Sequence, residues 1–202
     1  RPFDMGRATA AALGSGRPDT ESQANGALMR ISPLAIAGTH SEKHALATAA
    51  RADVSITHPS RVCGDVDAVF ATTIAFAIRT GASKGAILDF AVQTAREFEV
   101  AAPVLAVLEA SRTAAPVDFQ SQMGWVLIAL QNAFHVLLTA ESTEQGLRAT
   151  VARGGDTDTN AAIAGALLGA VHGRASIPVR WQRALFGCRP IGPGEHRDLG
   201  VR

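Results

Sequence analysis

The chain has 202 residues, of which 47% are hydrophobic and 18% charged, so one globular domain can bury a core without disulfides or metal staples. Its 19 basic and 18 acidic side chains give a net charge of +1, which excludes a strong field for nucleic acid or an anionic membrane. The longest apolar runs, over 68–78 and 161–171, are about half as long as a membrane-spanning helix.

The composition predicts an all-α domain, because the chain is rich in alanine and glycine and has no tyrosine. A short helix is predicted over 7–13. Apolar residues recur at helical spacing in five further windows, which are Ala45–Ile56, Val66–Ile78, Ala86–Phe98, Met123–Leu138 and Asn160–Val171. These windows are expected to form the core of a domain over 1–186. The polar stretch over 187–202 is expected to be a mobile tail.

Several patterns predict where helices begin and end. Thr39-His40-Ser41-Glu42 and Ser142-Thr143-Glu144-Gln145 both fit a capping box, so a helix should start at each. Pro33 lies inside an apolar run and should kink or interrupt a helix there. Asp65 and Asp67 precede the apolar run that begins at Ala68, and we interpret them as helix-capping residues.

The cysteine count indicates the compartment. Cys63 and Cys188 lie far apart, fit no CxxC spacing and are too few for a secreted disulfide framework. A reducing compartment, the cytoplasm, is therefore expected, with both cysteines chemically inert.

The most informative run is Gly154-Gly155-Asp156-Thr157-Asp158-Thr159-Asn160, which leads directly into the last apolar window. Two glycines allow backbone conformations closed to other residues, and two carboxylates then meet the start of a helix. Carboxylates that share a small volume repel each other unless a cation lies between them. Oxygen donors favour Mg²⁺, Mn²⁺ or Ca²⁺ over Zn²⁺. Asp156, Asp158 and the Thr159 hydroxyl are therefore candidate metal ligands.

The same run also fits a purely structural role. Asp, Thr and Asn are favoured N-cap residues, so the run could do no more than cap the helix. Behind the turn, Gly165 and Gly169 are spaced four apart and should let a neighbouring helix approach closely.

Gly154–Ala170 resembles the signature of the ADP-ribosylglycohydrolase family, the group of dinitrogenase-reductase-activating glycohydrolases and ADP-ribosylarginine hydrolases. Three further elements follow the family's order. They are the Asn-Gly…Met-Arg…Pro-Leu element over 25–34, the Thr-His segment Thr57-His58-Pro59 followed by Asp67-Ala68, and the closing stretch Ser176–Trp181.

The resemblance implies a compact all-α fold with two Mg²⁺ or Mn²⁺ ions in a cleft, and hydrolysis of the bond between C1 of ADP-ribose and an acceptor. It implies that Asp156, Asp158 and Thr159 are metal ligands. The partner would be an ADP-ribosylated protein or a related ADP-ribose conjugate. The candidate substrate-binding residues are Asn25, Gly26, Met29, Arg30, His58 and Gly155.

Each of these candidates also has a structural interpretation. Met29 could pack in the core, Arg30 could form a salt bridge, and His58 could be a loop histidine that caps the next element. Asn25-Gly26 could be a simple turn.

The sequence departs from the family at one important element. The family's remaining metal ligands come from a Thr-Asp-Asp element near the N-terminus, and this sequence contains no such element. We therefore expect the chain to be an incomplete portion of the enzyme that lacks the N-terminal helices. The alternative is a non-catalytic ADP-ribose-binding or structural homologue that has lost half of its metal site.

Overall fold

The structure is a computed structural model that describes residues 5–188, and it contains ten α-helices and no strand in that part of the chain. The all-α prediction is confirmed. The helices are α1 (Arg7–Ser15), α2 (Ser32–Ala37), α3 (Lys43–Ser55), α4 (Arg61–Thr80), α5 (Lys84–Glu97), α6 (Ala102–Ala110), α7 (Val126–Thr139), α8 (Thr143–Ala152), α9 (Thr157–His172) and α10 (Val179–Gly187). Two 3₁₀ turns, Leu28–Arg30 and Arg174–Ser176, complete the order. From residue 189 onward the expected tail lies outside the described residues.

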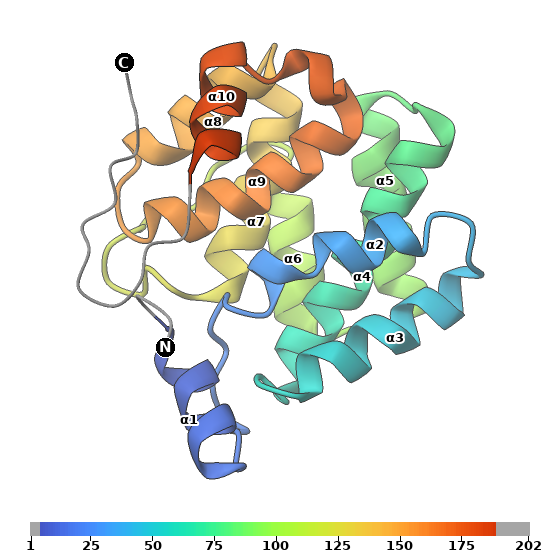
Figure 1. The fold of residues 1–202 in the computed structure, drawn as a ribbon. Coiled ribbons are helices and arrows are strands. Elements are labelled where there is room, and N and C mark those ends of the chain that lie inside the picture. The colour runs from blue at the N-terminus through green and yellow to red at the C-terminus, as the bar shows by residue number, and fades with distance from the viewer. Residues whose placement is uncertain (1–4, 189–202) are drawn as a thin grey trace.

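Helix α4 lies at the centre of the bundle and contacts α2, α3, α5, α7 and α9. Most of its residues are buried, in keeping with the long apolar run in its sequence. The helix begins where the Ser60 hydroxyl accepts a hydrogen bond from the Cys63 amide (3.2 Å). It ends at Gly81, whose φ of 59° is the left-handed conformation common at helix C-termini. Figure 1 shows α2 and α3 beside α4, with α1 projecting from the bundle.

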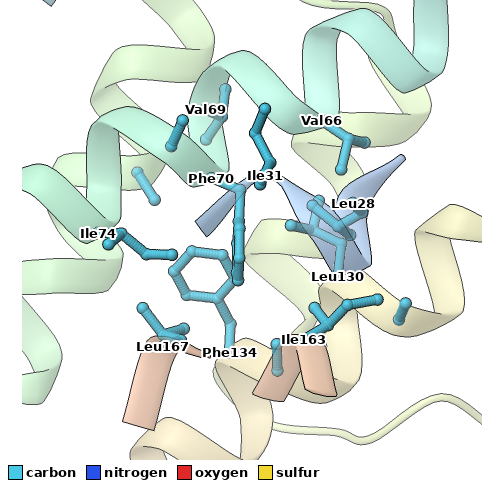
Figure 2. Packing of buried hydrophobic residues seen from close by; sticks show 14 of the residues in the cluster. Leu28, Ile31, Val66, Val69, Phe70, Ile74, Leu130, Phe134, Ile163 and Leu167 are labelled. Carbon is cyan, nitrogen blue, oxygen red and sulfur yellow. The ribbon is translucent and has the colours of Figure 1, made fainter. Parts of the chain in front are cut away.

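The core joins segments that are distant in the sequence. Phe70 of α4 and Phe134 of α7 meet edge to face, with ring centroids 6.4 Å apart and an interplanar angle of 85°. Figure 2 shows Leu28 and Ile163 close to this aromatic pair. The 3₁₀ turn that contains Leu28 and helix α9 thus pack on the same core. This packing places residue 25 beside the start of α9.

The pairing of α8 with α9 depends on glycines. A Cβ at Gly146 of α8 would lie 2.6 Å from the Leu168 side chain, and one at Gly165 of α9 would lie 3.3 Å from the Leu147 side chain. The close approach expected at Gly165 is therefore present. Gly169 is different, because a Cβ there would meet open space within the described part of the molecule.

Two of the predictions about helix starts are wrong, and one is confirmed. Ser142 caps α8 by accepting from the Gln145 amide (3.2 Å), as its pattern predicts. Thr39 instead donates its hydroxyl to the Ile36 carbonyl (2.6 Å), so it closes α2 rather than opening α3. Pro33 lies in the first turn of α2, where an amide needs no partner, and it begins this helix rather than kinking it.

The interpretation of Asp65 and Asp67 as caps is also wrong, because Ser60 caps α4 and both carboxylates are buried within the helix. Asp65 forms ion pairs with Arg51 and Arg61 and accepts a hydrogen bond from the Ala101 amide (2.8 Å). It therefore ties α4 to α3 and to the start of α6. Within residues 5–188, neither oxygen of Asp67 has a hydrogen-bond partner.

Two further observations concern the cysteines and membranes. Burial raises the pKa of the Cys63 thiol to about 11, so this cysteine stays protonated and unreactive near neutral pH. In the part of the chain that the structure describes, no helix has both the length and the apolar character needed to cross a membrane.

The central aromatic pair provides a test of the core. Replacing Phe134 with Ala should lower the free energy of unfolding by about 3–5 kcal/mol, because it leaves a cavity between α4, α7 and α9. Urea denaturation measures this change. Val117→Ala, at a fully exposed position, should change stability by less than about 0.5 kcal/mol. Equal effects of the two substitutions would contradict this description of the core.

Candidate functional site

Three distant segments meet at the start of α9, namely residues 23–26, residues 118–125 and residues 154–160. The first two pair as a short antiparallel bridge between Ala24 and Trp125. The Asn25 amide donates to the Gly124 carbonyl, and the Val126 amide donates to the Gln23 carbonyl (both 2.9 Å). This pairing fixes the Asn25 backbone against the loop that precedes α7.

The third segment approaches this loop closely because it contains two glycines. Gly154 and Gly155 have φ values of 77° and 70°, in the left-handed region that favours glycine. A Cβ at Gly155 would lie 2.0 Å from the Phe119 carbonyl oxygen, which is far inside van der Waals contact. A glycine is therefore required at position 155 for both its conformation and its lack of a side chain.

Asn25 links the first segment to the third. Its side-chain amide donates to Asp156 Oδ2 (2.9 Å) and to Asn160 Oδ1 (3.3 Å). Asn25 and Asn160 are both buried, whereas Asp156 is half-buried. A carboxylate oxygen can only accept, so the contact with Asp156 sets the orientation of the Asn25 amide. This contact holds one oxygen of Asp156 in place beneath the cleft described next.

Asp156, Asp158 and Gly155 line one open cleft of about 730 Å³. The carboxylates thus lie on a shared concave surface next to the Asn25 segment, as the metal hypothesis requires. The cleft's other walls were not found from the sequence, because only the fold brings the start of α1 and the loop before α7 to this turn. They are formed by Gly6, Arg7, Gln23, Ala24, Gln120, Ser121, Gln122, Met123, Gly124 and Trp125.

The capping alternative does not account for Asp156. Asp156 occupies the N-cap position of α9, yet among the described contacts its side chain accepts from Asn25 and not from an α9 amide. Asp158, in the first turn, accepts from the Thr159 amide (2.9 Å). The Asp158 carboxylate therefore accepts a hydrogen bond within the first turn of α9. Asp156 has a second oxygen, Oδ1, which does not accept from Asn25.

The remaining predicted substrate residues, Met29, Arg30 and His58, do not line this cleft. Arg30 forms an ion pair with Asp53, as its structural interpretation supposed. His58 is buried, and a Cβ at Gly26 would lie 3.1 Å from its Cε1 and Nε2 atoms. Met29 is 45% exposed, so it is not a core residue.

The site offers hard oxygen donors from a single turn. Within residues 5–188, no group of three His, Cys, Asp or Glu side chains is arranged to hold a metal ion. The donors at this turn are the two carboxylates and the hydroxyl of Thr159, which is the third residue of α9. Mg²⁺ typically binds through one or two carboxylates and retains several waters, so this donor set suits it.

Comparison with known proteins identifies the family. The family described as ADP-ribosylglycohydrolase matches residues 1–197, and the chain belongs to it. A solved structure described as an ADP-ribosylglycohydrolase-related protein complex matches with a TM-score of 0.77 and 31% sequence identity. The match covers 88% of this chain but only 62% of that chain. No curated protein matched.

The glycine pair provides a test of the turn. Gly155→Ala should cost at least about 1–2 kcal/mol of stability from its left-handed conformation alone, with a further cost from the clash with the Phe119 carbonyl. Gly169→Ala is the matched control, because it lies inside α9 in open space and should stabilise the protein by up to about 1 kcal/mol. Thermal unfolding of both variants measures the difference. A neutral Gly155→Ala would show that the turn does not pack as described.

The environment of His58 predicts a pH dependence. Burial, and then the Arg30 guanidinium, lower the pKa of His58 below its ordinary value of about 6.5. The unfolded chain therefore takes up this proton more readily than the folded protein. The contribution of His58 to stability should be complete above about pH 6.5 and be lost as the pH falls toward its folded pKa. His172, whose pKa is also lowered by burial, acts with the same sign. An NMR titration midpoint for His58 at or above 6.5 would contradict this account.

Proposed function

We propose that this chain carries part of the site of a metal-dependent ADP-ribosylglycohydrolase, which hydrolyses the bond between ADP-ribose and a protein side chain or related conjugate. The observation that carries the proposal is the position of Asp156. Its carboxylate is held by Asn25 at a cleft that Asp158 also lines, in a chain of this family.

The metal ligands in this proposal are Asp156, Asp158 and the Thr159 hydroxyl, and the ion is Mg²⁺ or Mn²⁺. A hard cation held by these residues would supply Lewis-acid chemistry, namely binding of vicinal ribose hydroxyls and activation of a water as the nucleophile. The protein's part is to orient these donors. Asn25 fixes Asp156 by its hydrogen bond, and the loop over 118–125 fixes the glycine turn.

The cleft also has features that suit an ADP-ribose unit. Arg7 is one of the residues that line it, and a guanidinium pairs well with phosphate oxygens. Gln120, Gln122 and Ser121 add polar side chains on the opposite segment, and Trp125 adds an aromatic surface. The Trp125 indole is held by a hydrogen bond to the Gln23 side chain (2.9 Å). Arg30, by contrast, is occupied by Asp53, so we assign the phosphate contact to Arg7 instead.

One observation favours the alternative of a non-catalytic ADP-ribose-binding homologue. The acidic donors at the cleft come from one turn, and the described residues bring no third His, Cys, Asp or Glu to them. A cation bound there would keep most of its water. Such a protein would bind ADP-ribose, with weak metal affinity, and would not hydrolyse its conjugates.

Calorimetry with Mn²⁺ tests the metal ligands. Asp156→Asn should weaken Mn²⁺ binding by more than about tenfold, because it removes a charge at the ion and disturbs the Asn25 contact. Asp89→Asn is the matched control, since Asp89 is an exposed carboxylate paired with Arg112 and lies outside the cleft; it should leave Mn²⁺ binding unchanged. Equal binding by Asp156→Asn and the wild-type chain would contradict the proposed metal site.

Activity then separates the two candidate functions. The wild-type chain is assayed for release of ADP-ribose from ADP-ribosylated arginine and serine peptides in the presence of Mn²⁺. Release that is lost in Asp156→Asn supports the hydrolase. Binding of ADP-ribose without release supports the non-catalytic homologue.

A further inference from the structure

A series of polar contacts links Asp53, Arg30, Thr57 and His58, next to residues 25–26. The Arg30 guanidinium forms an ion pair with the Asp53 carboxylate and also donates to the Asp53 carbonyl (3.0 Å). The same guanidinium donates to the Thr57 hydroxyl oxygen (3.0 Å), which lies 2.8 Å from His58 Nδ1. Thr57 and His58 are both buried, whereas the side chains of Arg30 and Asp53 are 35% and 31% exposed.

The chemistry of the donors fixes the direction of the Arg30–Thr57 hydrogen bond and favours one direction for the Thr57–His58 contact. A guanidinium can only donate, so the Thr57 oxygen accepts from Arg30. The acceptor that the structure offers to the Thr57 proton is His58 Nδ1. When the Thr57 hydroxyl donates to Nδ1, that nitrogen is unprotonated and the ring proton of neutral His58 resides on Nε2. A neutral ring agrees with the lowered pKa of His58.

The ring of His58 contacts Gly26, which follows the residue that holds the proposed metal ligand Asp156. A Cβ at Gly26 would lie 3.1 Å from both Cε1 and Nε2 of His58, so the ring packs against the Gly26 backbone. The preceding residue is Asn25, whose amide holds Asp156. An unbroken series of contacts therefore leads from Asp53, at the end of α3, to Asp156, at the start of α9.

We propose that Arg30 is a positioning residue for the metal-binding turn. Anchored by Asp53, Arg30 orients the Thr57 hydroxyl so that His58 is held as the Nε2–H tautomer against Gly26, and this ring keeps the Asn25 amide on Asp156. The predicted effect on metal binding rests on the proposed function. The tautomer and the Asn25 contact are properties of the protein itself.

The neighbouring charges favour this arrangement of Arg30. Asp67 of α4 is fully buried and lies within electrostatic range of Arg30, but burial raises its pKa well above the ordinary value. A raised pKa favours the uncharged form of Asp67, which weakens its competition with Asp53 for the guanidinium. The nearby Arg51 and Arg61 are engaged by Asp65. Arg30 is therefore the cation directed at Thr57.

The experiment uses NMR of the chain labelled with ¹⁵N, and it compares the wild type with Thr57→Val and Arg30→Lys. In the wild type, His58 should show a protonated Nε2 and an unprotonated Nδ1. Thr57→Val removes the hydroxyl and should give a mixture of His58 tautomers, with displaced side-chain amide resonances of Asn25. Arg30→Lys keeps a positive charge and a hydrogen-bond donor but loses the planar set of guanidinium N–H groups. It should therefore show a smaller displacement of the same resonances.

Mn²⁺ titration of the same samples measures the functional consequence. Thr57→Val should weaken Mn²⁺ binding by about 10-fold, the lower end of the range for residues that orient metal ligands. Arg112→Met, which breaks an exposed ion pair with Asp89, is the control and should leave both the spectra of residues 25 and 58 and the affinity unchanged.

Specific results would overturn the proposal. A wild-type His58 protonated on Nδ1 would do so, as would Asn25 resonances in Thr57→Val and Arg30→Lys that match the wild type. Unchanged Mn²⁺ affinity in Thr57→Val would also overturn it. If the wild-type chain bound no Mn²⁺, the proposed function would fail, whereas the two NMR readouts would still decide the role of Arg30.

Discussion

The candidate site depends on one hydrogen bond, from the Asn25 amide to the Asp156 carboxylate. It joins residues separated by 131 positions, and both segments reach it only because they pack on the same core. Leu28 follows Asn25 by three residues and Ile163 follows Asp156 by two helical turns, and both are fully buried beside Phe70 and Phe134. The position of the carboxylate is therefore a consequence of core packing, and the polar contact fixes its final orientation.

The helices of the core could be predicted from the sequence because hydrophobic periodicity reports burial directly. Helix starts were less predictable, since a Thr hydroxyl can bond equally well to the end of one helix or the start of the next. Thr39 illustrates this ambiguity, because its hydroxyl bonds to the Ile36 carbonyl of α2. Pro33 illustrates another, because proline favours the first turn of a helix as strongly as it disfavours the interior.

The candidate site could be predicted only in part, for a related reason. The turn over 154–160 can be recognised in the sequence, because the glycines that allow its conformation and the carboxylates that could bind a metal lie within seven residues. The loop that faces it has none, since residues 118–125 acquire their role only by lying against Gly155. Similarly, Arg30 belongs to a recognisable element, but its partner Asp53 lies on α3, and only the fold brings them together.

The same contacts bear on how strongly a single turn can bind a cation. A flexible pair of carboxylates must be ordered when an ion binds, and this ordering reduces affinity. Here Gly155 lets the Phe119 backbone approach closely, and the buried Asn25 contacts both Asp156 and Asn160, so the protein's own contacts order the turn. The folded core supplies the free energy that maintains this order. A cation that bound at this turn would therefore lose little affinity to the ordering of Asp156.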